Sequence, residues 1–120
     1  MGWLAAFLGG GLGSVARLAV GRWTLLQWGG GFPWGTLIVN VLGSFLIGLL
    51  AARLSAFEAN HTLRLFLVTG LLGGFTTFSA FSLDAMTLWQ RGDAGTAAAY
   101  ILATLVLSLA AAPLGFLAGR

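Results

Sequence analysis

Residues 73–82 read GGFTTFSAFS and lie inside an apolar run from Leu63 to Trp89. The run is long enough to cross a bilayer as a helix, since about 20 apolar helical residues span the hydrocarbon core. Two glycines and two threonines near its centre disfavour a continuous helix. A break within a membrane frees backbone N–H and C=O groups that protein, water or an ion must satisfy. This stretch therefore predicts a membrane helix that is broken near its middle.

Three further apolar runs surround this one, and each is long enough to cross a bilayer. The four predicted spans cover residues 3–26, 34–54, 63–89 and 96–117. The turn WGGGFP at 28–33 and polar loops at 55–62 and 90–95 separate them. Because these spans use nearly the whole chain, we predict a single all-α transmembrane domain over residues 1–120, in which the third helix is the broken one.

The composition is that of a membrane protein, with 58% hydrophobic and 8% charged residues. A soluble domain carries about 25% charged residues, and disorder requires high charge with low hydrophobicity. The arginines are scattered singly, so the net charge of +3 does not indicate a nucleic-acid-binding surface. Cysteine is absent and histidine occurs once, which excludes a disulfide framework and a thiolate or histidine-cluster metal site.

The arginines do not favour one orientation in the membrane. Cytoplasmic loops normally carry an excess of Lys and Arg, but four spans place three arginines on one side and two or three on the other. The first side has Arg53, Arg64 and Arg120, and the second has Arg22, Arg91 and, if it is counted, Arg17. Either the chain has one weakly biased orientation, or it inserts both ways and pairs opposite orientations. Nineteen glycines and small-residue pairs such as Gly9–Gly13 and Ser44–Gly48 indicate close helix contacts and favour an oligomer.

Polar or small residues recur every four residues in the second and fourth predicted spans. The two rows are Thr36, Asn40, Ser44 and Gly48, and Thr96, Tyr100, Thr104 and Ser108. One interpretation is hydrogen bonding between packed helices, and the other is the lining of a polar path. Hydrogen bonding alone is the weaker explanation for Asn40, whose amide has four hydrogen-bonding positions within an otherwise apolar run. Two such rows together favour the path and make Thr36 a candidate member of it.

Phe78 and Phe81 follow the predicted break and share one face of the next helical segment, since they are three residues apart. An aromatic ring has a negative face and a positive edge. Two ring edges can therefore contact a small anion without a full positive charge. The alternative is that both rings only face lipid or fill the protein core.

Several residue patterns that catalysis or proton coupling requires are missing from the chain. Glu58 and Asp93 lie in predicted loops, and Asp84 lies towards one end of its span. A proton-coupled pump requires a titratable group in its path, and none is evident. The only histidine, His61, is in a loop and there is no cysteine, so no nucleophile–base pair is predicted. We expect no enzymatic activity.

Three motifs carry a resemblance to a known family. They are GTLIVNVLGSF at 35–45, GGFTTFSAFS at 73–82 and, more weakly, GGLGSVAR at 10–17. In these motifs and in its length of four spans, the chain resembles the Fluc (CrcB-type) fluoride channels. The first two motifs, in this order and spacing, are highly specific, and the resemblance covers the whole chain.

The resemblance implies a fluoride-selective channel that exports fluoride passively through a polar path. Asn40, Phe78 and Phe81 match the residues that contact the ion in that family. The hydroxyl groups implied to continue the path are those of Thr77, Ser79, Tyr100, Thr104 and Ser108. Arg17 matches an arginine that lies towards an aqueous vestibule. Ala80 stands where many relatives have threonine, so one hydroxyl beside the phenylalanine pair is missing.

The resemblance also implies the assembly and its surroundings. It implies an antiparallel, dual-topology homodimer with two pores, embedded in the lipid of the cell (inner) membrane as a multi-pass protein. Backbone carbonyls matching Gly73 and Thr76 of both subunits would hold one structural Na⁺ at the dimer centre. The alternatives are a small dual-topology proton-coupled exporter, which would need a carboxylate that the first span lacks, and a purely structural membrane subunit.

Overall fold

The computed structural model describes residues 2–56 and 60–120 of the chain. Every element in these two ranges is helical, as predicted. The helices are α1 (Gly2–Trp28), α2 (Trp34–Ala56), α3 (His61–Arg64), η1 (Leu65–Leu72), α4 (Gly73–Phe75), α5 (Phe78–Gln90) and α6 (Ala94–Gly119). Part of the predicted loop at 55–62, including Glu58, lies outside the described residues.

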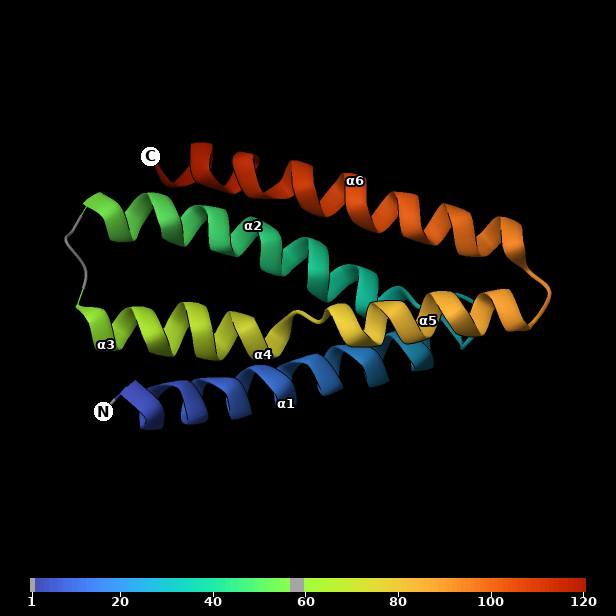
Figure 1. The fold of residues 1–120 in the computed structure, drawn as a ribbon, viewed down its shortest axis with the longest axis horizontal. Helices are drawn as coiled ribbons and strands as arrows, with labels where there is room; N and C mark the ends of the chain where they lie inside the picture. Colours follow the sequence, from blue (N-terminus) through green and yellow to red (C-terminus); the bar gives the residue numbers. More distant parts are fainter. Residues whose placement is uncertain (1, 57–59) are drawn as a thin grey trace.

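Four helical segments are long and apolar enough to cross a membrane, which confirms this part of the prediction. Three of them are α1, α2 up to Arg53, and α6, and the fourth runs from His61 to Gln90 through α3, η1, α4 and α5. Figure 1 shows them side by side along the long axis of a 49 × 29 × 22 Å molecule. The two chain ends lie at the same end of the molecule, and the α1–α2 and α5–α6 connections lie at the other.

The helices extend one or two residues beyond most of the predicted span limits, because the caps lie in the polar connections. Asp93 accepts a hydrogen bond from the Thr96 N–H at 3.3 Å and begins α6. Asn60 accepts from the Thr62 N–H at 2.8 Å and begins α3. Gly29 and Gly92 follow the ends of α1 and α5 with φ of +75° and +80°, a region that glycine enters without steric cost.

The third span changes its helical geometry twice. Its first turn is α-helical, Leu65–Leu72 form a π-helix, and Gly73–Phe75 return to a single α-helical turn. Thr76 and Thr77 then adopt extended conformations, with φ/ψ of −87°/156° and −153°/128°, before α5 begins at Phe78. The residues that leave the helix are thus the two threonines, while both preceding glycines remain helical.

The glycines bring the helices together in two pairs. The α2 helix packs mainly against α6, and α1 packs mainly against η1 and α4. A Cβ atom on Gly13 would lie 2.1 Å from the Leu71 carbonyl oxygen, and one on Gly48 would lie 1.9 Å from that of Ala112. The small-residue pairs noted in the sequence therefore serve contacts within one chain, so they no longer argue for an oligomer.

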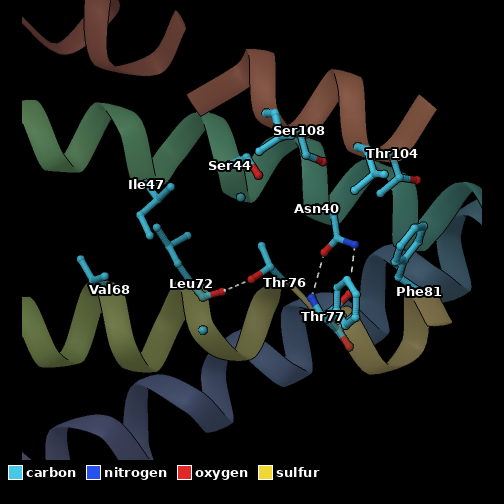
Figure 2. Close-up of a pocket in the computed structure, with 15 residues that line it drawn as sticks. Asn40, Ser44, Ile47, Val68, Leu72, Thr76, Thr77, Phe81, Thr104 and Ser108 are labelled. Carbon is cyan, nitrogen blue, oxygen red and sulfur yellow. Dashed lines mark hydrogen bonds between the residues drawn. The ribbon is translucent and has the colours of Figure 1, made fainter. Parts of the chain in front are cut away.

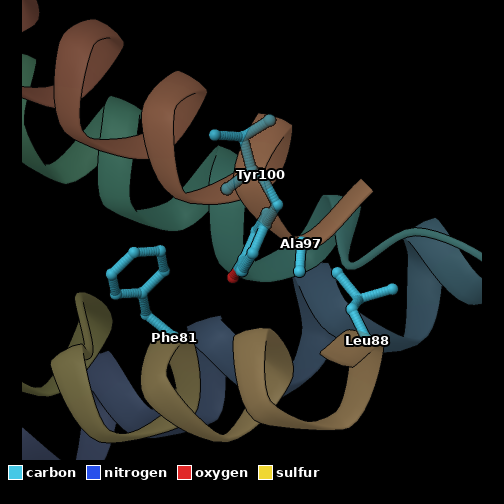
Figure 3. Packing of buried hydrophobic residues seen from close by; sticks show 5 residues of the cluster. Phe81, Leu88, Ala97 and Tyr100 are labelled. Atoms are coloured by element: carbon cyan, nitrogen blue, oxygen red, sulfur yellow. The ribbon is translucent and has the colours of Figure 1, made fainter. Parts of the chain in front are cut away.

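A small apolar cluster fixes α5 against α2 and α6 near the end that carries the α5–α6 connection. Its buried members are Leu37, Phe81, Leu88, Ala97 and Tyr100, and Figure 3 shows how the α5 and α6 members lie. Tyr100 is fully buried and Leu88 nearly so. This cluster orients Phe81 and Tyr100, two of the predicted site residues.

Candidate functional site

The extended segment between α4 and α5 is stabilised at each end by its own threonine. The Thr76 hydroxyl donates to the Leu72 carbonyl at 2.9 Å and thereby closes the end of α4. The Thr77 hydroxyl accepts from the Ala80 N–H at 3.1 Å and caps the start of α5. The Thr77 hydroxyl thus satisfies an N–H at the start of α5, where helix donors lack backbone partners. The Thr76 hydroxyl adds a second hydrogen bond to the Leu72 carbonyl, which also accepts from the Thr76 N–H at 3.0 Å.

Asn40 of α2 holds the same segment from across the cleft. Its Nδ2 donates to the Thr77 carbonyl at 3.0 Å, and its Oδ1 accepts from the Thr77 N–H at 2.8 Å. Figure 2 shows the two bonds side by side. The sequence predicts that the polar row on α2 either forms hydrogen bonds between packed spans or lines a polar path. For Asn40 the first interpretation applies, since its amide bonds to the third span. These bonds use one of the two amide hydrogens and one of the two acceptor positions, which leaves one of each for a ligand.

Two carbonyl groups lose their helical donors because of these contacts. The Thr77 N–H, which would bond to the Gly73 carbonyl in a continuous helix, donates to Asn40. The Ala80 N–H, which would bond to the Thr76 carbonyl, donates to the Thr77 hydroxyl. Neither the Gly73 nor the Thr76 carbonyl accepts a hydrogen bond within residues 2–56 and 60–120. These are the two predicted cation ligands, and carbonyl oxygens freed at a broken membrane helix attract cations.

A cleft of about 360 Å³ lies between the extended segment, α2 and α6. Figure 2 shows side chains from all three pointing into it. Of the predicted site residues, those that line it are Asn40, Gly73, Thr76, Thr77, Phe78, Phe81, Thr104 and Ser108. The sequence did not single out Gly43, also in the lining, where an added Cβ would lie 2.0 Å from the Thr76 methyl group.

Two hydroxyl groups in the cleft lack partners. The Thr104 Oγ1 and the Ser108 Oγ are buried and have no hydrogen-bond partner among the residues that the structure describes. Leaving such a group unsatisfied costs about 1–3 kcal/mol. The two residues are one turn apart on α6, about 6 Å along the helix axis. A ligand or water molecule in the cleft would satisfy both groups.

The two phenylalanines differ in their surroundings. Their ring centroids are 5.6 Å apart and the rings are tilted by 57°. Phe81 is 6% exposed and packs against Tyr100 at 5.3 Å, whereas Phe78 is 74% exposed. The rings therefore form a contacting pair, but only Phe81 belongs to the core, and Phe78 lies on the open side of the cleft.

Tyr100 lies beyond Phe81 and connects the site to an acidic residue. Its hydroxyl donates to Asp84 Oδ2 at 3.1 Å, and the Thr36 side chain lies near the same hydroxyl. Sequence reasoning set Asp84 aside because of its place near a span end. The signal that could have found it is its spacing of three residues from Phe81, which puts both on one face of α5.

The remaining predicted residues lie outside the cleft lining. The Ser79 hydroxyl is 3.3 Å from that of Thr77, on the side of the extended segment. Arg17 lies on α1, where its Nε donates to the Gly74 carbonyl at 3.1 Å. The structure thus brings most predicted path residues together around one cleft, places Tyr100 and Thr36 at one end, and places Arg17 behind the extended segment.

Comparisons with known proteins identify sequences that are similar to this chain. Residues 4–116 match the family model described as CrcB-like protein, Camphor Resistance (CrcB). A protein of Agrobacterium fabrum named fluoride-specific ion channel FluC is 57% identical over 113 residues, 93% of this chain and 90% of its own length. Relatives with the same name from Rhizobium johnstonii and Paracoccus denitrificans are 56% and 54% identical, covering 90% and 98% of this chain and 86% and 93% of their own lengths.

Proposed function

The chain belongs to the CrcB-like family, and on that premise we propose that it is a fluoride-selective channel of the cell (inner) membrane. Its relatives are named as channels rather than enzymes, and its four long apolar helices make it a multi-pass membrane protein. The observation that carries the proposal is the cleft. Two buried hydroxyls that find no partner among the described residues converge there with an asparagine amide and aromatic rings.

The residues of the cleft suit a small, strongly hydrated anion. An anion that enters must exchange its water shell for donors that bind it weakly enough to release it. The hydroxyls of Ser108 and Thr104 supply two donors in succession, and the free amide hydrogen of Asn40 supplies another. Phe81 offers a positive ring edge at the level of the extended segment. The path then continues past the rings to Tyr100 and Thr36.

The open side of the cleft supports an assembly of two chains. Phe78 is largely exposed and lines the cleft, so one chain alone does not enclose the path. We propose an antiparallel homodimer with two pores, in which a second copy covers this side. The nearly balanced arginines fit a chain that inserts in both orientations.

The free carbonyls support a structural cation at the centre of that dimer. Gly73 and Thr76 of one chain supply two oxygens, and a symmetry-related chain would supply two more. A bound Na⁺ would neutralise the oxygen dipoles that otherwise face one another. It takes no part in carrying fluoride. The contacts of Asn40 and of the Thr77 hydroxyl keep both carbonyls available for it.

A fluoride-efflux measurement tests the proposal. The purified protein is reconstituted into liposomes loaded with KF, and a fluoride electrode records efflux after addition of a K⁺ ionophore, a protonophore or both. A passive fluoride channel gives efflux with the K⁺ ionophore alone, because the counter-ion removes the opposing potential.

Efflux that requires the protonophore, or that follows a pH gradient, would instead support a proton-coupled exporter. Asp84 would then be its proton-carrying group, since among the described residues it is the carboxylate that contacts the path, through the Tyr100 hydroxyl. No efflux under either condition would support a structural subunit.

A further inference from the structure

We infer that Arg17 is a positioning residue that holds the end of α4 through the Gly74 carbonyl and so fixes the extended segment beside the cleft. The contact itself stands on the structure, and its effect on fluoride flux rests on the proposed function. The resemblance to the fluoride channels implies only that an arginine here lies towards an aqueous vestibule.

The Gly74 carbonyl needs a donor from outside its own helix. In a continuous helix it would accept from the Phe78 N–H, but Thr76 and Thr77 are extended and carry Phe78 away. The Arg17 Nε donates to this oxygen at 3.1 Å, and Arg17 makes no other hydrogen bond within the described part of the chain. The guanidinium thus replaces the missing backbone donor.

Glycine contacts bring α1 close enough for this bond to form. A Cβ atom on Gly74 would lie 2.4 Å from the Gly10 carbonyl oxygen, and one on Gly13 would lie 2.1 Å from that of Leu71. The backbones of α1 and α4 therefore touch directly. Arg17 is four residues beyond Gly13, one turn further along α1, where it meets the end of α4.

The positive charge of Arg17 is also favourable at the C-terminal end of α4. The helical run from His61 to Phe75 ends at the extended segment, so its C-terminal carbonyls carry partial negative charge. A cation near such an end is stabilising, and a guanidinium inside an apolar span requires an acceptor. The Gly74 carbonyl meets both requirements.

This contact also determines which carbonyls remain free. Among the carbonyls that lose their helical donors at the break, Gly74 is bound by Arg17, whereas Gly73 and Thr76 stay available to a cation. Arg17 thus acts on the back of the extended segment, opposite the Asn40 bonds. We expect its loss to let the segment and the attached Phe78 shift.

Isotope labelling can observe the contact directly. The chain contains three Gly–Phe peptide bonds, at 31–32, 74–75 and 115–116. Protein labelled with ¹³C at the glycine carbonyls and ¹⁵N at phenylalanine therefore gives three carbonyl signals by solid-state NMR in liposomes. Substitution Phe75→Leu identifies the Gly74 signal by its disappearance.

The variants are Arg17→Lys and Arg17→Gln, with Arg22→Gln as the matched control. Arg22 is an exposed arginine of the same helix without a hydrogen bond in the described residues. We expect the Gly74 signal to move upfield in both Arg17 variants, because hydrogen bonding shifts a carbonyl carbon downfield, and to stay in place in the control. An unchanged Gly74 signal in Arg17→Lys overturns the inference, whether or not Arg17→Gln folds.

Flux then separates positioning from simple attraction of anions. If Arg17 positions the segment, Arg17→Lys keeps the charge but loses the Nε donor, and flux falls about tenfold at every ionic strength. If Arg17 only attracts fluoride, Arg17→Lys conducts normally, and the deficit of Arg17→Gln disappears in high salt. Normal flux in Arg17→Lys therefore overturns the inference. Absence of flux in the wild type would overturn the proposed function and leave the NMR result valid.

Discussion

The side-chain amide of Asn40 pairs with both backbone groups of Thr77, donating to its carbonyl at 3.0 Å and accepting from its N–H at 2.8 Å. In an antiparallel β-ladder, a residue likewise donates its N–H to the opposite strand and accepts a hydrogen bond from that strand with its C=O. Here a side chain takes the place of a second strand. The extended segment is thereby held without a strand partner, in a protein whose other described elements are helices.

Substitution of Asn40→Asp removes the amide donor and adds a negative charge. We expect fluoride flux to fall by more than tenfold, because the Thr77 carbonyl loses its donor and the carboxylate repels the anion. The fold should lose about 1 kcal/mol, as expected when a partly buried carbonyl loses its hydrogen bond. Liposome flux and thermal unfolding in detergent measure the two effects. Leu42→Met, an exposed apolar change on the same helix, should alter neither, and wild-type flux in Asn40→Asp would contradict the path assignment.

Replacement of the phenylalanines by isoleucine separates packing from contact with the ion. Phe78→Ile and Phe81→Ile keep apolar bulk but remove the positive ring edge, and such swaps usually cost less than about 1.5 kcal/mol. We expect the protein to remain folded while flux falls strongly for both. Phe7→Ile is the matched control for Phe78, since the two residues are 76% and 74% exposed. If both cleft variants conduct like the control, the rings only pack.

The glycines between α2 and α6 should not accept a methyl group. In Gly48→Ala and Gly115→Ala the new Cβ would lie 1.9 Å from a backbone carbonyl oxygen, so the helices must separate. We expect each change to destabilise the fold by about 1–3 kcal/mol. Gly11→Ala is the control, because nothing lies within 4 Å of its Cβ position. There the helix propensity of alanine should raise stability by up to about 1 kcal/mol. If Gly48→Ala or Gly115→Ala unfolds at the same temperature as Gly11→Ala or at a higher one, the close contact between α2 and α6 would be contradicted.

A cation held by the Gly73 and Thr76 carbonyls should stabilise the protein specifically. We expect the melting temperature in detergent to rise steadily with the logarithm of the NaCl concentration above the Kd, since a ligand that binds only the folded state stabilises by about 2.7 kcal/mol at a hundredfold excess over its Kd and by more at higher excess. Choline chloride at equal ionic strength is the control. Equal melting curves in the two salts would argue against the cation site.

Added positive charge should fix the orientation of the chain. Gln90→Lys with Gly95→Lys places two lysines beside the α5–α6 connection, which should keep that end on the cytoplasmic side. A dual-topology dimer then loses flux, and a partner biased the opposite way restores it. Because the chain has no cysteine, one introduced at Ala94 reports orientation by its labelling with an impermeant thiol reagent. Wild-type protein that labels from one side only would contradict dual topology.

The sequence predicts the four spans because hydropathy and length alone determine them. It does not predict the π-helix, since Leu65–Leu72 are apolar except for Thr69 and give no periodic signal for one helical geometry over another. From the sequence, Gly73 and Gly74 are expected to contribute to the break in the third helix. In the structure Gly73 and Gly74 remain helical, and Gly74 instead allows α1 to approach.

The candidate site is predictable in its residue types and not in its contacts. Asn40 and the hydroxyl row on α6 stand out as polar groups in apolar runs. The partners of Asn40, Arg17 and Tyr100 are 37, 57 and 16 residues away along the chain. They depend on which helices pack together. Small-residue pairs mark the glycines at which backbones approach closely, but no local pattern reveals which helix each of them meets.

The order of helix pairing constrains how the chain can be assembled during synthesis. The main contacts join α1 to the third span and α2 to α6, so the first and third spans form one pair and the second and fourth the other. Neither pair is a hairpin of consecutive helices. A ribosome therefore delivers α1 and α2 to the bilayer before the principal partner of either has been made. The α2 surface around Gly48 stays uncovered until the last 26-residue helix emerges, so a nascent chain arrested after Gln90 should remain susceptible to membrane proteases.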